Sequence, residues 1–166
     1  IEERITHPLV HMSNRWKEVD RLGQSLLYDN LSRKFITEGK IARMIDELGL
    51  RGITSNPSIF EKSISKGTEY DEDIEQSVRD GLTTDEIYER LTTDDVRNAA
   101  DILRPVYDRT NTLDGYVSIE VDAKLANDAA ATIQEAHRLW ATVNRPNRLV
   151  KGPGTVEGAK AVRQLI

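Results

Sequence analysis

Short apolar runs, separated by longer amphipathic segments, dominate the pattern of hydrophobic and polar positions. The runs are short enough for buried strands, and the longer segments repeat apolar residues every three or four positions, as helices do. The four strand candidates are Leu26–Tyr28, a run that ends at Ile53, the alternating residues 115–122, and residues 148–151. Strands that alternate with helices in this way predict a parallel sheet covered by helices.

Local signals place several helix boundaries. Gly49 is well placed to end the helix after the first strand. Asn56–Pro57 is a strong start signal, because asparagine caps helices and proline fits the first helical position. Thr84 and Thr93 each precede acidic residues and predict two further helix starts, and Pro105 is expected to kink or end a helix.

Two architectures fit this order of elements: a doubly wound sheet, or part of an eight-stranded (β/α) barrel. The chain of 166 residues opens without methionine and stops inside an amphipathic pattern with no capping residue. We therefore expect residues 1–166 to form part of one larger domain.

Composition narrows the class of protein. An apolar share of 38% and a charged share of 31% suit a folded soluble domain, and no apolar stretch is long enough to cross a membrane. The net charge of −5 disfavours nucleic-acid and anionic-membrane partners, and the lack of cysteine excludes disulfides and thiolate chemistry. A cytoplasmic location is the default expectation.

Each predicted strand ends on a polar or charged group. The first ends at Asp29, the second at residues 54–56, the third at Glu120 and the fourth at Lys151. In parallel α/β folds the carboxyl ends of the strands share one edge or one mouth, so these residues should converge. Taken singly, Asp29 and Asn56 fit helix caps, Glu120 fits a solvated face, and Lys151 fits a surface lysine. Their coincidence at four strand ends favours an active site.

Such a set supports a particular chemistry. A lysine amine among apolar neighbours is desolvated, which favours the neutral amine, and this can form a Schiff base with a ketone. Two carboxylates can carry the proton transfers of imine formation and carbon–carbon bond cleavage. No metal or other cofactor is required. His7 and His11 have a spacing that can bind zinc on a helix, but Pro8 and the lack of an acidic partner favour a solvent-facing terminus.

Several segments together resemble transaldolases, specifically the bacterial-type enzymes of the pentose phosphate pathway. They are "GLRGITSNPSIFEKSI", "YDEDI", "LRPVYDRTN", "DGYVSIEVDAKLANDAAATIQEAHRLW" and "VNRPNRLVKGPGTVEG". The resemblance covers nearly the whole chain and implies a (β/α)8 TIM barrel, of which about the first four strands and their helices are present. It also implies transfer of a dihydroxyacetone unit between sugar phosphates: from sedoheptulose 7-phosphate or fructose 6-phosphate to glyceraldehyde 3-phosphate or erythrose 4-phosphate.

The same resemblance assigns roles to five residues. Lys151 matches the Schiff-base lysine, and Asp29 matches the aspartate that takes the proton from the C4 hydroxyl of the substrate. Glu120 matches the glutamate that works through a water during imine formation and hydrolysis. Thr54 and Asn56 match positions beside the dihydroxyacetone moiety.

Two departures from the family pattern leave alternatives open. The family usually continues its lysine with valine-proline-alanine-threonine, whereas this chain has Gly152-Pro153-Gly154-Thr155, which predicts a freer loop and weaker activity. A complete barrel takes about 250 residues, so a missing carboxy-terminal half or a homo-oligomer is expected. The alternatives are an aldolase that uses free dihydroxyacetone, as fructose 6-phosphate aldolases do, and a non-catalytic half-barrel or interaction module.

Overall fold

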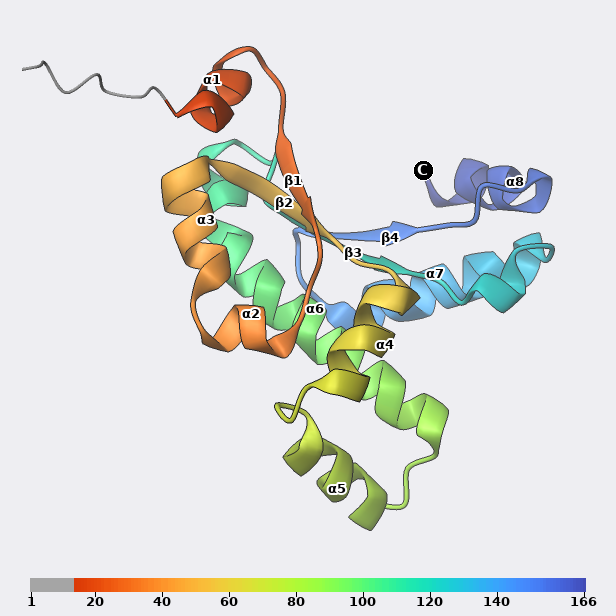
Figure 1. The fold of residues 1–166 in the computed structure, drawn as a ribbon. Helices are drawn as coiled ribbons and strands as arrows, with labels where there is room; N and C mark the ends of the chain where they lie inside the picture. The colour runs from red at the N-terminus through yellow and green to blue at the C-terminus, as the bar shows by residue number, and fades with distance from the viewer. Residues whose placement is uncertain (1–13) are drawn as a thin grey trace, which may run out of the picture.

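Four parallel strands form one sheet at the centre of the chain (Figure 1). The computed structural model describes residues 14–166, so the predicted terminal histidines, His7 and His11, lie outside the described residues. The strands are β1 (Leu26–Asp29), β2 (Leu50–Thr54), β3 (Tyr116–Glu120) and β4 (Arg148–Lys151). All four agree with the strands predicted from the apolar runs.

The order of the strands decides between the two predicted architectures. Neighbouring strands in the sheet follow the chain order, β1-β2-β3-β4, and every pair is parallel. In a doubly wound sheet the strand order reverses at a switch point, whereas in a (β/α) barrel each strand follows its predecessor around the wall. The described residues therefore have the topology of part of a (β/α) barrel.

Helices connect the strands and cover one face of the sheet. In Figure 1, α3, α6 and α7 run along this face, and α6 lies against β2 and β3. The helices are α1 (Arg15–Arg21), α2 (Arg33–Thr37), α3 (Lys40–Leu48), α4 (Pro57–Lys66), α5 (Asp71–Arg79), α6 (Thr84–Arg109), the 3-10 turn η1 (Ala123–Leu125), α7 (Ala129–Val143) and α8 (Val156–Leu165). No helix within residues 14–166 is both long and apolar enough to cross a membrane.

The hydrophobic core lies between these helices and the sheet. Val117 and Ile119 point from β3 toward α6, whose Val96, Ala100 and Leu103 have no exposed surface. Burial of each such side chain stabilises the fold by about 1.5–3 kcal/mol before the cost in conformational entropy. Because side chains alternate between the two faces of a strand, Ser118 and Glu120 of β3 lie on the opposite face.

The long helix α6 corrects two predictions. Its start is close to the predicted one, but Thr83 is the N-cap, and Thr83 and Glu86 form a reciprocal capping box. Thr93 is a buried residue inside α6 and not a helix start, and the helix continues through Pro105. The packing of Leu103 and Val106 against the sheet, on both sides of the proline, offsets the hydrogen bond that Pro105 cannot donate.

The other face of the sheet is open within the described part of the chain. Leu27 of β1 and Leu149 of β4 point to this face, and 55% and 47% of their surfaces are exposed. In a complete barrel this face is the packed interior. The side chains on this face therefore include those that a barrel would gather around its axis.

Candidate active site

The last residue of every strand is one of the predicted site residues. Asp29 ends β1, Thr54 ends β2, Glu120 ends β3 and Lys151 ends β4. Asp29 lies opposite Thr54 and Glu120 lies opposite Lys151 in the registers of the sheet. Because side chains alternate between faces along a strand, these registers place all four side chains on the open face, at its carboxyl edge.

Asp29 and Thr54 form the first of two polar pairs. The Thr54 hydroxyl donates a hydrogen bond to Oδ1 of Asp29, with 2.6 Å between the oxygens. This hydrogen bond fixes the orientation of the Asp29 carboxylate. The second oxygen of this exposed carboxyl group can then accept a proton from a bound hydroxyl.

Lys151 and Glu120 form the second pair. Nζ of Lys151 lies 3.1 Å from Oε2 of Glu120, and 37% and 32% of the two side chains are exposed. The Lys151 amine is thus partly exposed and paired with a carboxylate in this structure, and its role as the Schiff-base lysine stays a prediction. The pair places a proton acceptor next to the amine.

Two buried serines join the strands between these pairs. The Ser55 hydroxyl donates to the main-chain carbonyl of Ser118 at 2.6 Å, and both residues are buried. The next residue, Asn56, caps α4 as predicted, with its Oδ1 accepting from the Ile59 N–H at 3.0 Å. The role of Asn56 in substrate binding stays a prediction.

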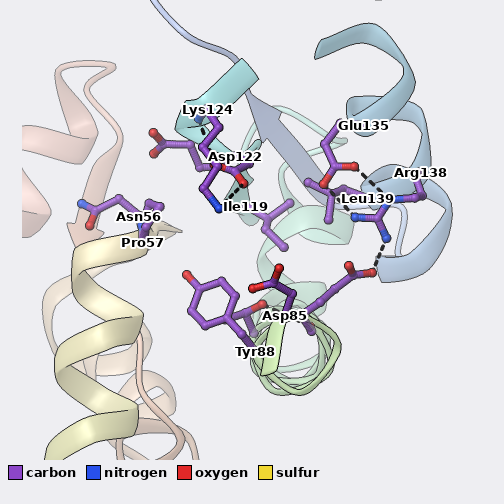
Figure 2. A pocket seen from close by; sticks show the side chains of 13 residues that line it. Asn56, Pro57, Asp85, Tyr88, Ile119, Asp122, Lys124, Glu135, Arg138 and Leu139 are labelled. Carbon is purple, nitrogen blue, oxygen red and sulfur yellow. Dashed lines mark hydrogen bonds and ion pairs between the residues drawn. The ribbon is translucent and has the colours of Figure 1, made fainter. Parts of the chain in front are cut away.

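A cavity of about 380 Å³ opens beside Glu120 and Asn56 (Figure 2). Figure 2 shows Asn56 at the start of α4 on one side, Asp85 and Tyr88 of α6 below, and Arg138 of α7 opposite. Sequence reasoning missed most of its lining. The missed polar residues are Asp85, Tyr88, Glu89, Thr92, Asp122, Lys124, Glu135 and Arg138. Asp122 and Lys124 lie in the segment just after the end of β3, and this position is a signal that could have revealed them.

The charges of this cavity disfavour an anion. Five carboxylates and two cationic side chains line it. Arg138 donates hydrogen bonds to Glu135 and Glu89, which raise its pKa in that order, so the positive charge of this guanidinium is already paired with two carboxylates. Burial raises the pKa of Tyr88, and the nearby carboxylates of Asp122 and Glu120 raise it further. The cavity thus suits hydroxyl groups better than a phosphate.

Comparison with known proteins identifies the family. The sequence model described as transaldolase/fructose-6-phosphate aldolase matches residues 26–166, which is most of the chain. The chain belongs to the transaldolase/fructose-6-phosphate aldolase family. The resemblance inferred from the motifs is confirmed at this level.

Curated transaldolases are among its relatives. The chain is 51% identical over 153 residues to transaldolase 2 of a Nostoc species, which covers 92% of this chain and 40% of the relative. It is 47% identical to the transaldolase of Trichodesmium erythraeum, over 93% of this chain and 41% of the relative. It is also 47% identical to the transaldolase of Thiobacillus denitrificans, over 92% of this chain and 42% of the relative. The chain therefore spans about two fifths of the length of these transaldolases.

The loop after Lys151 carries the departure from the usual transaldolase sequence. A side chain at Gly154 would meet open space, and one at Gly152 would lie 3.9 Å from Val162. A Cβ atom therefore has room at both positions, and neither glycine is required by a close contact. Gly158 differs, because a Cβ there would lie 1.9 Å from the carbonyl oxygen of Pro153.

Gly158→Ala is therefore expected to destabilise the protein by about 1–3 kcal/mol, because the loop after Lys151 must move away from α8. Gly154→Ala is the matched control and should stabilise it by about 0.4–1 kcal/mol, since it restricts only the unfolded chain. Urea unfolding of both variants measures the difference. Equal stabilities would show that the loop does not pack on α8 in this way.

Proposed function

We propose that the protein containing this chain is a transaldolase of the pentose phosphate pathway that acts in the cytoplasm. It transfers a dihydroxyacetone unit from sedoheptulose 7-phosphate or fructose 6-phosphate to glyceraldehyde 3-phosphate or erythrose 4-phosphate. Membership of the family supports the reaction class. The observation that carries the proposal is the convergence of Lys151, Glu120 and Asp29 on one edge of one sheet face.

The reaction begins with imine formation at Lys151. Glu120, 3.1 Å away, accepts a proton from the ammonium group, directly or through a water, and leaves a neutral amine. The amine nitrogen bonds to the C2 carbonyl carbon of the ketose, and protonation of the resulting hydroxyl releases water. The product is an iminium ion, which attracts the electrons of the adjacent bond.

Asp29 then acts in bond cleavage. Its carboxylate, oriented by Thr54, takes the proton of the C4 hydroxyl, and the C3–C4 bond breaks. The C4 oxygen becomes the carbonyl of the departing aldose, and the bonding electrons form an enamine with the Lys151 nitrogen. Addition of the enamine to the acceptor aldehyde, with proton return from Asp29, reverses these steps. Hydrolysis of the imine releases the new ketose.

Reductive trapping tests this proposal. The full-length protein is incubated with fructose 6-phosphate and borohydride, and the adduct is mapped by peptide mass spectrometry. A reduced three-carbon or six-carbon adduct on Lys151 is the expected result. An adduct on another lysine, such as the nearby Lys124, would contradict the assignment of the nucleophile.

The second candidate is a half-barrel without turnover. Two observations favour it: the glycines beside Lys151 and the exposed Leu27 and Leu149 on the open face. Folded protein that forms no adduct on any lysine would support this function.

A third candidate is an enzyme that releases free dihydroxyacetone, as the fructose-6-phosphate aldolase part of the family name suggests. Such an enzyme would form the adduct on Lys151 but transfer nothing to an acceptor aldose phosphate.

The expected missing carboxy-terminal half, or a homo-oligomer, stays a proposal. Either would cover the open face, where Leu27 and Leu149 are exposed. The basic groups that bind the substrate phosphate would belong to this covering part, because the cavity beside Glu120 is mostly acidic.

A further inference from the structure

A closed ring of hydrogen bonds holds the segment that follows Asp29. Arg33 is the first residue of α2, so its main-chain N–H has no acceptor within that helix. The Tyr70 hydroxyl accepts this N–H at 2.9 Å and donates to Oδ2 of Asp95 at 2.7 Å. Nε of Arg33 donates to Oδ1 of Asp95 at 3.0 Å, which closes the ring.

The ring is buried and its members restrain one another. Asp95 has no exposed surface and Tyr70 is 1% exposed. The Arg33 guanidinium also lies over the Tyr70 ring, 4.6 Å from its centroid, and pairs with Asp73 of α5. Burial raises the pKa of Asp95, while the bonds from Tyr70 and Arg33 oppose this rise. Because the buried Asp95 carboxylate accepts hydrogen bonds from two fixed donors, the start of α2 has little freedom to move.

Arg33, the member of the ring that belongs to α2, lies four residues after the proposed base, Asp29. Between them, Leu31 is fully buried and its carbonyl accepts a hydrogen bond from Ser63 of α4 at 3.2 Å. The loop from β1 to α2 is thus attached at Leu31 and again at Arg33, and the second attachment comes from α5, its N-cap Tyr70 and α6. These helices belong to the long connection between β2 and β3.

We propose that Arg33, Tyr70 and Asp95 are positioning residues, which hold the β1–α2 loop so that the Asp29 carboxylate stays against Thr54 and in reach of the substrate's C4 hydroxyl. This inference depends on the proposed role of Asp29 as the base. A displacement of about 1 Å in such a group can cost about 100-fold in rate. Imine formation at Lys151 lies on the other pair of strands and does not use Asp29.

Tyr70→Phe in the full-length protein tests the inference, because it deletes one oxygen and two hydrogen bonds of the ring. We expect kcat for transfer to fall about 10- to 100-fold, with the rate of borohydride trapping on Lys151 within twofold of the parent. Tyr116→Phe is the matched control, since it deletes the same atom at the opposite end of the sheet, where the hydroxyl donates to the Thr112 carbonyl. It should change neither rate.

Arg33→Lys is a milder second variant in case Tyr70→Phe does not fold. Lysine keeps the charge and the main-chain N–H but cannot reach Asp95 and Asp73 together. Transfer that is unchanged in both variants, or transfer and trapping that fall equally, would overturn the positioning role. Asp29→Asn separates this failure from a failure of the proposed function: if it leaves kcat intact, Asp29 is not the base at all.

Discussion

Lys151→Met is expected to abolish transfer, with a loss of at least about 10⁴-fold, as removal of a covalent nucleophile does in other enzymes. Methionine keeps the length and apolar stem of lysine but has no amine to bond to the ketose carbon. The ion pair with Glu120 is partly exposed, so its loss should hardly change the fold. Steady-state transfer from fructose 6-phosphate to erythrose 4-phosphate measures the effect.

Lys160→Met provides the control for this variant. Lys160 is an exposed residue of α8 that pairs with Glu157 at 3.6 Å, so its replacement also removes one lysine and one ion pair. Its transfer rate and its adduct on Lys151 should match the parent. Lys151→Met that keeps a tenth of the parent activity, with unchanged folding, would show that another group forms the covalent intermediate.

Asp29→Asn is expected to separate the two halves of the reaction. Asparagine has the same shape, and its amide oxygen can still accept the Thr54 hydroxyl, but it cannot take the C4 proton. We expect kcat for transfer to fall about 10²- to 10⁴-fold, the range for loss of a general base. Borohydride trapping on Lys151 should continue, because in the proposed mechanism imine formation uses Glu120 and not Asp29.

The trapped species supplies a second measurement for this variant. With bond cleavage blocked, mass spectrometry of Asp29→Asn should find the intact six-carbon adduct and little of the three-carbon one. Asp46→Asn, at an exposed position of α3, is the control and should behave as the parent. Loss of trapping in folded Asp29→Asn would assign Asp29 to imine formation and contradict the division of roles between the two pairs.

The proposed division of roles agrees with the geometry of the sheet. Neighbouring parallel strands lie about 4.8 Å apart, so only adjacent strand ends can bring short side chains into direct contact. Asp29 contacts Thr54, and Lys151 contacts Glu120. Strands β2 and β3 therefore separate Asp29 from Lys151. A bound ketose, with its C2 at Lys151 and its C4 hydroxyl at Asp29, would connect the pairs across the open face.

Local patterns in the sequence were sufficient to predict the four strands and the residues that end them. The apolar runs are short and flanked by turn or cap residues, so local chemistry alone set β1 to β4 and the cap at Asn56. Parallel topology then required Asp29, Thr54, Glu120 and Lys151 to share one edge. The motifs around them were specific enough to indicate the family.

The pairing of these groups, and the contacts that hold them, depend on the tertiary fold and could not be predicted from local patterns. The pairing of Lys151 with Glu120 depends on the register of β3 and β4, because a shift of one residue would turn the Lys151 side chain to the other face of the sheet. The continuity of α6 through Pro105 depends on burial against the sheet, which overrides the local preference. The ring of Arg33, Tyr70 and Asp95 joins residues up to 62 positions apart, and no local pattern encodes contacts at that separation.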